Sequence, residues 1–126
     1  MNSTTLLLRQ VHPTFIQAGR ITSQVFRPTP KDENKLSVDN GDMISAEDSY
    51  IRFISDPNCH SIGVMAVSRE ECEQQELPVL EDGEPYPEHC SIDYSGFSKK
   101  KVERIAKVLR TLADRRGWQY QDGSRL

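Results

Sequence analysis

Hydrophobic and polar residues alternate over several short stretches of the chain, which is typical of strands that bury one face. Strands are predicted at residues 4–11, 20–27, 36–38, 61–67 and 89–94. The fourth stretch is apolar on both faces, which indicates an internal strand. In the last stretch, His89, Ser91 and Asp93 share one polar face, so we expect that strand to present its other face to the core.

Three helices are predicted from capping signals and from apolar residues spaced three or four positions apart. The first begins at Ser45 and ends before Pro57. The second begins at Ser68, which can form a reciprocal capping box with Glu71. The third covers residues 98–116 and is the longest and the most clearly amphipathic. Strands and helices are therefore interspersed along the chain.

The composition fits one globular domain. The 126 residues are 36% hydrophobic and 28% charged, so the chain can bury a core without metals or disulfides. We predict one α+β domain over residues 1–126, with a mixed or antiparallel sheet of about five short strands and three helices, the longest C-terminal. No apolar run approaches the roughly 20 residues of a membrane span, and the first residues carry no basic signal segment. A cytoplasmic protein without membrane contact is expected.

Charge is unevenly divided along the chain. Residues 1–98 carry seven Lys and Arg against sixteen Asp and Glu, whereas residues 99–126 carry nine against three. Two interpretations are open: the basic helix neutralises the chain's own acidic segment, residues 70–93, or it contacts an acidic partner protein. Nucleic acid is disfavoured as a partner, because the domain is acidic overall and the helix lacks interleaved aromatic residues. The candidate partner-binding residues are Lys99, Lys100, Lys101, Arg104 and Lys107.

The cysteines and histidines raise the question of a metal site. Cys59, Cys72 and Cys90 are odd in number and widely spaced, so we expect free thiols in a reducing compartment. Cys59-His60 and His89-Cys90 supply the ligand types of a zinc site, but adjacent residues on a strand point to opposite faces, and no metal is predicted. A Cys–His nucleophile pair stays open. The glycine-rich phosphate loop and the common catalytic motifs are absent from the sequence, so no cofactor is predicted.

A polar cluster near the second predicted strand contains the candidate ligand-binding residues Arg20, Ser23 and Arg27. An arginine offers a planar fork of donors that matches phosphate or carboxylate. The alternative is a solvated edge strand. His89 is the candidate general acid or base, because an imidazole can exchange a proton near neutral pH. Catalysis of this kind requires His89 and the two arginines to converge on one cleft.

Four segments resemble small bacterial proteins of similar length whose function is unassigned. They are residues 22–28 (Thr-Ser-Gln-Val-Phe-Arg-Pro), 36–38 (Leu-Ser-Val), 63–67 (Gly-Val-Met-Ala-Val) and 87–89 (Pro-Glu-His). The resemblance extends over most of the chain up to Tyr94. It implies a bacterial origin and a role for Ser23, Phe26 and His89, and it implies no reaction.

Two functions follow as hypotheses. The favoured one is a small cytoplasmic interaction module, an accessory or regulatory subunit that binds a partner protein through its charge-segregated surface. The alternative is a small enzyme that acts on a nucleotide, RNA or another phosphate-bearing substrate with His89 as acid or base. The sequence leaves the oligomeric state open.

Overall fold

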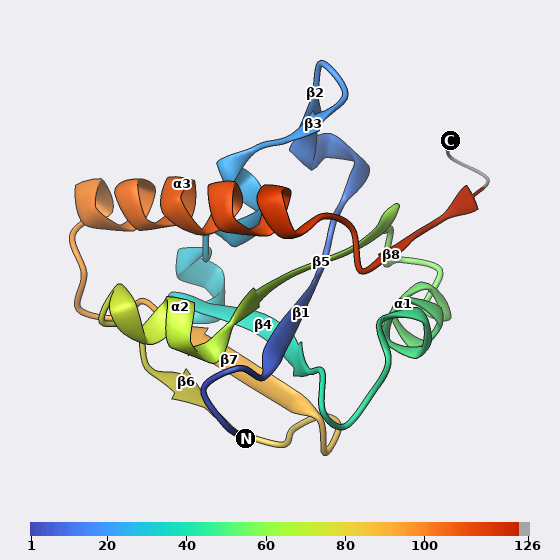
Figure 1. The fold of residues 1–126 in the computed structure, drawn as a ribbon, viewed down its shortest axis with the longest axis horizontal. Coiled ribbons are helices and arrows are strands. Elements are labelled where there is room, and N and C mark those ends of the chain that lie inside the picture. Colours follow the sequence, from blue (N-terminus) through green and yellow to red (C-terminus); the bar gives the residue numbers. More distant parts are fainter. Residues whose placement is uncertain (124–126) are drawn as a thin grey trace.

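An antiparallel sheet with helices on both faces forms the centre of the computed structural model, which describes residues 1–123 (Figure 1). Within that range the sheet has six strands in the order β6-β7-β4-β1-β5-β8. The strands are β1 (Leu6–Gln10), β4 (Lys35–Asn40), β5 (Gly63–Ser68), β6 (Val79–Leu80), β7 (His89–Asp93) and β8 (Tyr120–Gln121). A separate hairpin pairs β2 (Ile16–Gln17) with β3 (Arg20–Ile21). The predicted α+β class is confirmed.

Three α-helices lie in the described chain: α1 (Ala46–Ile54), α2 (Arg69–Gln74) and α3 (Lys99–Arg116). The hydroxyls of Ser45, Ser68 and Ser98 each accept the backbone N–H three residues later, at 3.0 to 3.2 Å. All three predicted helix starts are therefore confirmed. Glu71 completes the capping box of α2 by accepting from the Ser68 N–H. None of the helices described is long and apolar enough to cross a membrane.

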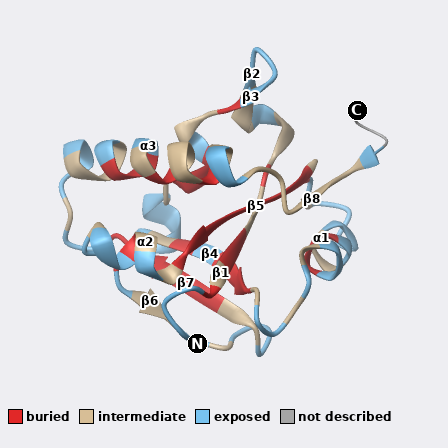
Figure 2. Cartoon of the chain, viewed as in Figure 1, coloured by how far each residue is buried: buried red, intermediate tan, exposed pale blue. Residues whose placement is uncertain are grey.

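The two faces of the sheet bury separate clusters of apolar side chains. Leu7 on β1 packs in the larger cluster beneath α3, whereas its neighbour Leu8 packs against Tyr50 of α1. Every residue of β5 is buried, because both of its faces are covered (Figure 2). The prediction of an internal strand is thus confirmed. A side chain at Gly63 would lie 2.5 Å from the Tyr120 carbonyl oxygen, so the missing Cβ permits the close approach of β8.

The prediction of a strand over residues 20–27 is wrong. Only Arg20–Ile21 is a strand, and it belongs to the small hairpin. Ser23–Phe26 forms a 3-10 helix that packs against α3. Val25 and Phe26 are consecutive and both fully buried, which a strand with one covered face does not allow. Tertiary packing has overridden the β-propensity of these residues.

Strands β1 and β4 separate along their length. They pair only at Leu7 with Asn40 and at Leu8 with Asp39, although β1 continues alongside β5 and β4 alongside β7. Pairing also carries β4 through Asp39 and Asn40, beyond the strand predicted at residues 36–38. Arg9 lies in the resulting gap. This gap positions the candidate site.

Candidate functional site

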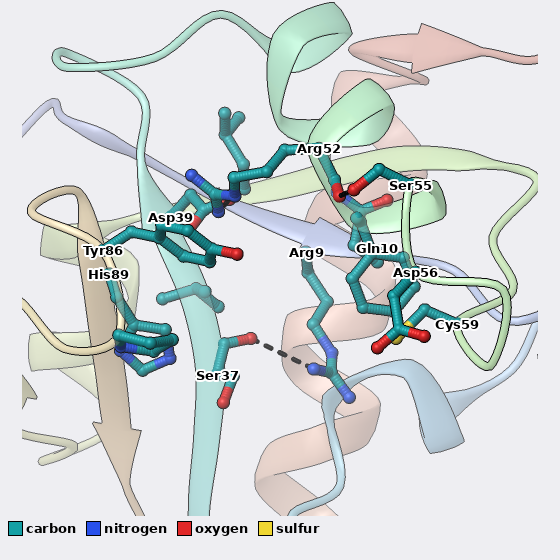
Figure 3. Close-up of a pocket in the computed structure, with 14 residues that line it drawn as sticks. Arg9, Gln10, Ser37, Asp39, Arg52, Ser55, Asp56, Cys59, Tyr86 and His89 are labelled. Carbon is teal, nitrogen blue, oxygen red and sulfur yellow. Dashed lines mark hydrogen bonds and ion pairs between the residues drawn. The ribbon is translucent and has the colours of Figure 1, made fainter.

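A cavity of about 310 Å³ opens where β1 and β4 separate (Figure 3). Its walls come from β1, β4, α1, the start of β7 and residues 85–86. In Figure 3, His89 and Tyr86 lie on one side of Arg9, and Asp56 and Cys59 lie on the other. Segments far apart in the sequence therefore meet at this place.

His89 reaches the cavity from the first position of β7. Its Nδ1 lies 2.6 Å from Asp82 Oδ1, and the Ser91 hydroxyl donates to Asp82 Oδ2 at 2.6 Å. Burial alone would raise the pKa of Asp82, but the hydrogen bonds from Ser91 and His89 outweigh it, so the pKa is lowered. Asp82 is thus an ionised partner that orients the ring. Within residues 1–123, His89 Nε2 makes no hydrogen bond and is left for a ligand.

Arg9 bridges the gap between the two strands. Its Nε donates to the Val25 carbonyl at 2.8 Å and its Nη1 to the Ser37 carbonyl at 3.0 Å. Burial lowers the pKa of Arg9 to about 10, with Tyr94 and Asp32 acting in the opposite direction, so the guanidinium stays charged at neutral pH. No carboxylate of the described chain lies within ion-pair distance of it. A desolvated cation with only carbonyl partners attracts anions.

Arg52 of α1, in contrast, is already paired. Its Nη2 lies 2.8 Å from Asp39 Oδ2, and its Nη1 donates to Glu88 Oε1. Asp39 also accepts from the Ser49 hydroxyl at 2.6 Å, and the Arg52 Cζ lies 4.0 Å from the centre of the Tyr86 ring. Arg52 therefore ties α1 to β4 and to the segment before β7, and its charge is compensated.

The cysteines are not activated as nucleophiles. Burial raises the pKa of Cys72 to about 12 and that of Cys90 to about 11. Cys59 lies in the cavity wall, where desolvation and then the carboxylate of Asp56 raise its thiol pKa. Cys90 packs in the core, whereas His89 on the opposite face lines the cavity. Among the described residues, no three His, Cys, Asp or Glu side chains are grouped to hold a metal ion.

The three predicted ligand-binding residues do not line the cavity that contains His89. Arg20 lies on β3 and pairs with Asp114 of α3 at 3.2 Å, with its side chain 70% exposed. Ser23 is the first residue of the 3-10 helix Ser23–Phe26, and Arg27 follows its last residue. The structure thus separates these residues from His89.

The arginines that accompany His89 are Arg9 and Arg52, which the sequence analysis did not single out. One signal for Arg9 was available. Arg9 shares its strand parity with Leu7 and Val11, both of which are fully buried, so a charge stands at an inward-facing position. For Arg52, no local pattern distinguished it from an ordinary solvated helix residue.

The predicted partner-binding residues all lie in the N-terminal half of α3. Lys101 pairs with Glu76 at 3.6 Å and covers the Phe97 ring at 4.4 Å. Farther along the helix, Arg116 pairs with Glu71 at 2.9 Å. The helix therefore neutralises part of the chain's own acidic segment. The other four predicted partner-binding residues are exposed and form no ion pair with any described residue: Lys99, Lys100, Arg104 and Lys107.

Comparison with known proteins adds no assignment to this geometry. The sequence matches no protein-family model. Neither a curated protein nor a solved structure is significantly similar to it. The chemistry of this protein must therefore be inferred from the side chains of the cavity and of α3.

Proposed function

We propose that the protein is a small enzyme that binds a phosphate-bearing molecule in the cavity between β1 and β4 and uses His89 as general acid or base. One observation carries this proposal. A half-buried guanidinium with no carboxylate within ion-pair distance, Arg9, and an imidazole oriented by a carboxylate, His89, line the same cavity. The first attracts an anion and the second moves a proton.

Phosphate recognition follows from the guanidinium N–H groups of Arg9 that are not used in hydrogen bonds within the protein. The Val25 and Ser37 carbonyls occupy one N–H on Nε and one on Nη1, so the remaining N–H groups of the planar fork are free for an anion. The partly desolvated position strengthens the attraction. Arg52 does not compete for this role, because Asp39 and Glu88 already share its guanidinium.

Proton transfer follows from the orientation of His89. Because Nδ1 is held by Asp82, Nε2 is the atom that takes a proton from water or substrate, or returns it to a leaving group. The ionised carboxylate at 2.6 Å stabilises the positive charge that the ring gains during the transfer. The pair therefore has the arrangement of an acid–base dyad, with Asp82 as the positioning residue.

Phosphate binding is tested by titrating isotope-labelled protein with inorganic phosphate and pyrophosphate and following the NMR signals of the Arg9 side chain and of β1 and β4. We expect Arg9→Gln to weaken binding by about tenfold or more, since charge-assisted hydrogen bonds contribute about 1.5–3 kcal/mol. Arg20→Gln is the matched control, because Arg20 is exposed and outside the cavity. No response to either anion, or equal losses for the two variants, would refute the proposal.

Catalysis is tested with p-nitrophenyl phosphate and bis(p-nitrophenyl) phosphate as generic substrates. His89→Gln should bind phosphate normally and reduce turnover by about 10²- to 10⁴-fold, the usual contribution of a positioned acid or base. Asp82→Asn should also reduce turnover and alter its pH profile, whereas a residue of structural importance alone would leave the profile unchanged. Full activity in His89→Gln would remove the histidine from the mechanism.

A second function is supported by α3. Lys99, Lys100, Arg104 and Lys107 form an exposed cluster without ion pairs inside the described chain. Such a cluster favours an acidic partner protein, for which this chain would be an accessory or regulatory subunit in the bacterial cytoplasm. The three free thiols suit that reducing compartment.

Affinity purification at low and moderate salt tests this second function, with nuclease treatment to exclude nucleic acid. A stoichiometric, nuclease-resistant partner that is lost from the double variant Arg104→Glu/Lys107→Glu would support it. Lys101→Glu is the comparison variant and should affect partner binding less, because Lys101 is already paired with Glu76. Recovery of the protein alone at both salt concentrations would count against an interaction module, because charge-driven contacts are strongest at low salt.

A further inference from the structure

A second cavity, of about 240 Å³, adjoins the first. Arg9, Gln10, Phe53 and Cys59 line both cavities. Arg9 therefore lies at their junction, and a ligand held by it can extend into either space. Taken together, the two cavities fall within the range of about 300–1,000 Å³ that is typical of small-molecule sites.

Aromatic side chains from two separate segments form part of the wall of the second cavity. Phe53 comes from α1, and His12 and Phe15 come from the segment that follows β1. The His12 ring centre lies 5.8 Å from that of Phe15 and 6.0 Å from that of His60, the latter in an edge-on arrangement. Phe15 and Phe53 are only half-buried, so part of each ring remains available for contact.

Polar groups at the same cavity can read the edge of a planar ligand. His12 Nδ1 accepts from the Thr14 N–H at 3.1 Å, so the neutral ring carries its proton on Nε2 and donates there. The side-chain amide of Asn58 makes no hydrogen bond within residues 1–123 and offers a donor and an acceptor. The Gln10 amide, in contrast, is committed to Ser49 and Ser61.

We propose that the phosphate-bearing ligand is a nucleotide whose base occupies an aromatic subsite formed by His12, Phe15, Phe53 and Asn58. This inference rests on the proposed function, because it places the phosphate against Arg9 and beside His89. Aromatic rings accept any nucleobase by stacking, and the amide and imidazole supply the hydrogen bonds of an unpaired base edge. The same chemistry is offered by a free nucleoside monophosphate and by the terminal nucleotide of an RNA strand.

Calorimetric titration of the full chain separates this inference from the proposed function. The ligands are the four ribonucleoside 5′-monophosphates, ribose 5-phosphate and inorganic phosphate. We expect at least one nucleotide to bind about tenfold more tightly than ribose 5-phosphate, which is the scale of one base stacked on an aromatic ring. If ribose 5-phosphate binds as tightly as every nucleotide, the base subsite is wrong and the phosphate site stands. If none of the six binds, both proposals fail.

Two variants locate the base. His12→Asn keeps a capping acceptor for the Thr14 N–H and removes the ring. Phe53→Leu removes the aromatic wall from α1. Each should lower nucleotide affinity to that of ribose 5-phosphate. His12→Asn should leave the affinity for ribose 5-phosphate unchanged, because His12 lies outside the cavity that contains His89. Phe97→Leu is the matched control, because Phe97 is also partly buried and lies outside both cavities.

The two variants test the same subsite independently, so one of them is sufficient if the other does not fold. Should Phe53→Leu fail to give a folded protein, His12→Asn decides the question alone, since it retains the local cap. The aromatic subsite is refuted if folded His12→Asn binds the nucleotide as tightly as the wild type does and Phe53→Leu either has the same affinity or does not fold. A short RNA that ends in the preferred base then distinguishes the two sources. Tighter binding than the mononucleotide indicates a strand end, and equal or weaker binding indicates the free nucleotide.

Discussion

Replacing Arg52 by methionine should destabilise the fold more than any other single loss of charge at the cavity. Methionine preserves much of the apolar length of the side chain and removes both ion pairs at once. The carboxylates left behind are poorly solvated, since the Asp39 and Glu88 side chains are only 10% and 17% exposed. The two carboxylates also lie close to one another, because both contact the same guanidinium.

The size of the effect follows from this burial. Removing one partner of a buried ion pair costs about 3–5 kcal/mol, because the remaining charge is uncompensated. Asp39 keeps the hydrogen bond from the Ser49 hydroxyl, and Glu88 has some access to water, so we expect the lower end, about 3 kcal/mol. For a chain of this length that free energy corresponds to a decrease in Tm of about 10 °C.

Urea unfolding of the wild type, Arg52→Met, Asp39→Asn and the double variant measures the pairwise term. The double-mutant cycle should give a coupling energy of about 2 kcal/mol between Arg52 and Asp39. Arg20→Met is the matched control, and its exposed pair with Asp114 should contribute less than about 1 kcal/mol. If Arg52→Met costs no more than Arg20→Met, or if the cycle shows no coupling, Arg52 does not clamp these elements together.

Three further outcomes follow from other contacts. Tyr94→Phe removes the buried hydroxyl that donates to the Phe26 carbonyl at 2.6 Å and should cost about 1–3 kcal/mol in urea unfolding, because that carbonyl is left unpaired. Ser68→Ala breaks the capping box of α2 and should lower the unfolding free energy by about 1 kcal/mol. Burial alone would raise the pKa of Asp82 and Glu71, but their hydrogen bonds outweigh it and lower both values. The stabilisation from these two carboxylates is therefore complete above their ordinary pKa values, 3.8 for Asp82 and 4.5 for Glu71, and is lost as the pH falls through the lower pKa values of the folded state. Asp82→Asn should therefore reduce the loss of stability that acid causes below about pH 4.

Local signals were enough to predict most of the secondary structure. The helix starts depend on a serine hydroxyl and a backbone N–H three residues away. Strand β7 follows from side-chain alternation, and β1 and β5 follow from short apolar runs. Strands β6 and β8 have two residues each, too few for a periodic pattern, and exist because neighbouring chain segments pair with them. The prediction of a strand over residues 20–27 was wrong for a related reason, because packing against α3 determines the conformation of Ser23–Phe26.

The candidate site was less accessible to sequence reasoning than the fold. His89 could be singled out because an imidazole is suited to proton transfer near neutral pH. Strand alternation then separates its side chain from Cys90 in the core. Its partner Asp82 lies in a loop that is brought back to β7, with the Gly83 N–H donating to the His89 carbonyl at 3.0 Å. Arg9 joins the site only because β1 and β4 stop pairing after Leu8. Strand separation is a property of the whole sheet, and no local motif encodes it.

The two proposed functions occupy opposite faces of the same sheet, and this arrangement allows both to hold. The cavity is lined by α1 and the residues that follow it, whereas α3 covers the larger apolar cluster on the other face of the sheet. No residue of α3 lines either cavity, so a partner bound to Lys99, Lys100, Arg104 and Lys107 leaves the route to His89 open. The element between the two surfaces is the 3-10 helix Ser23–Phe26, which packs under α3 and whose Val25 carbonyl accepts from Arg9. A partner that shifted α3 would therefore act on the cavity through Arg9, the cation proposed to hold the phosphate, and an effect of partner binding on ligand affinity would pass through Arg9 rather than through His89.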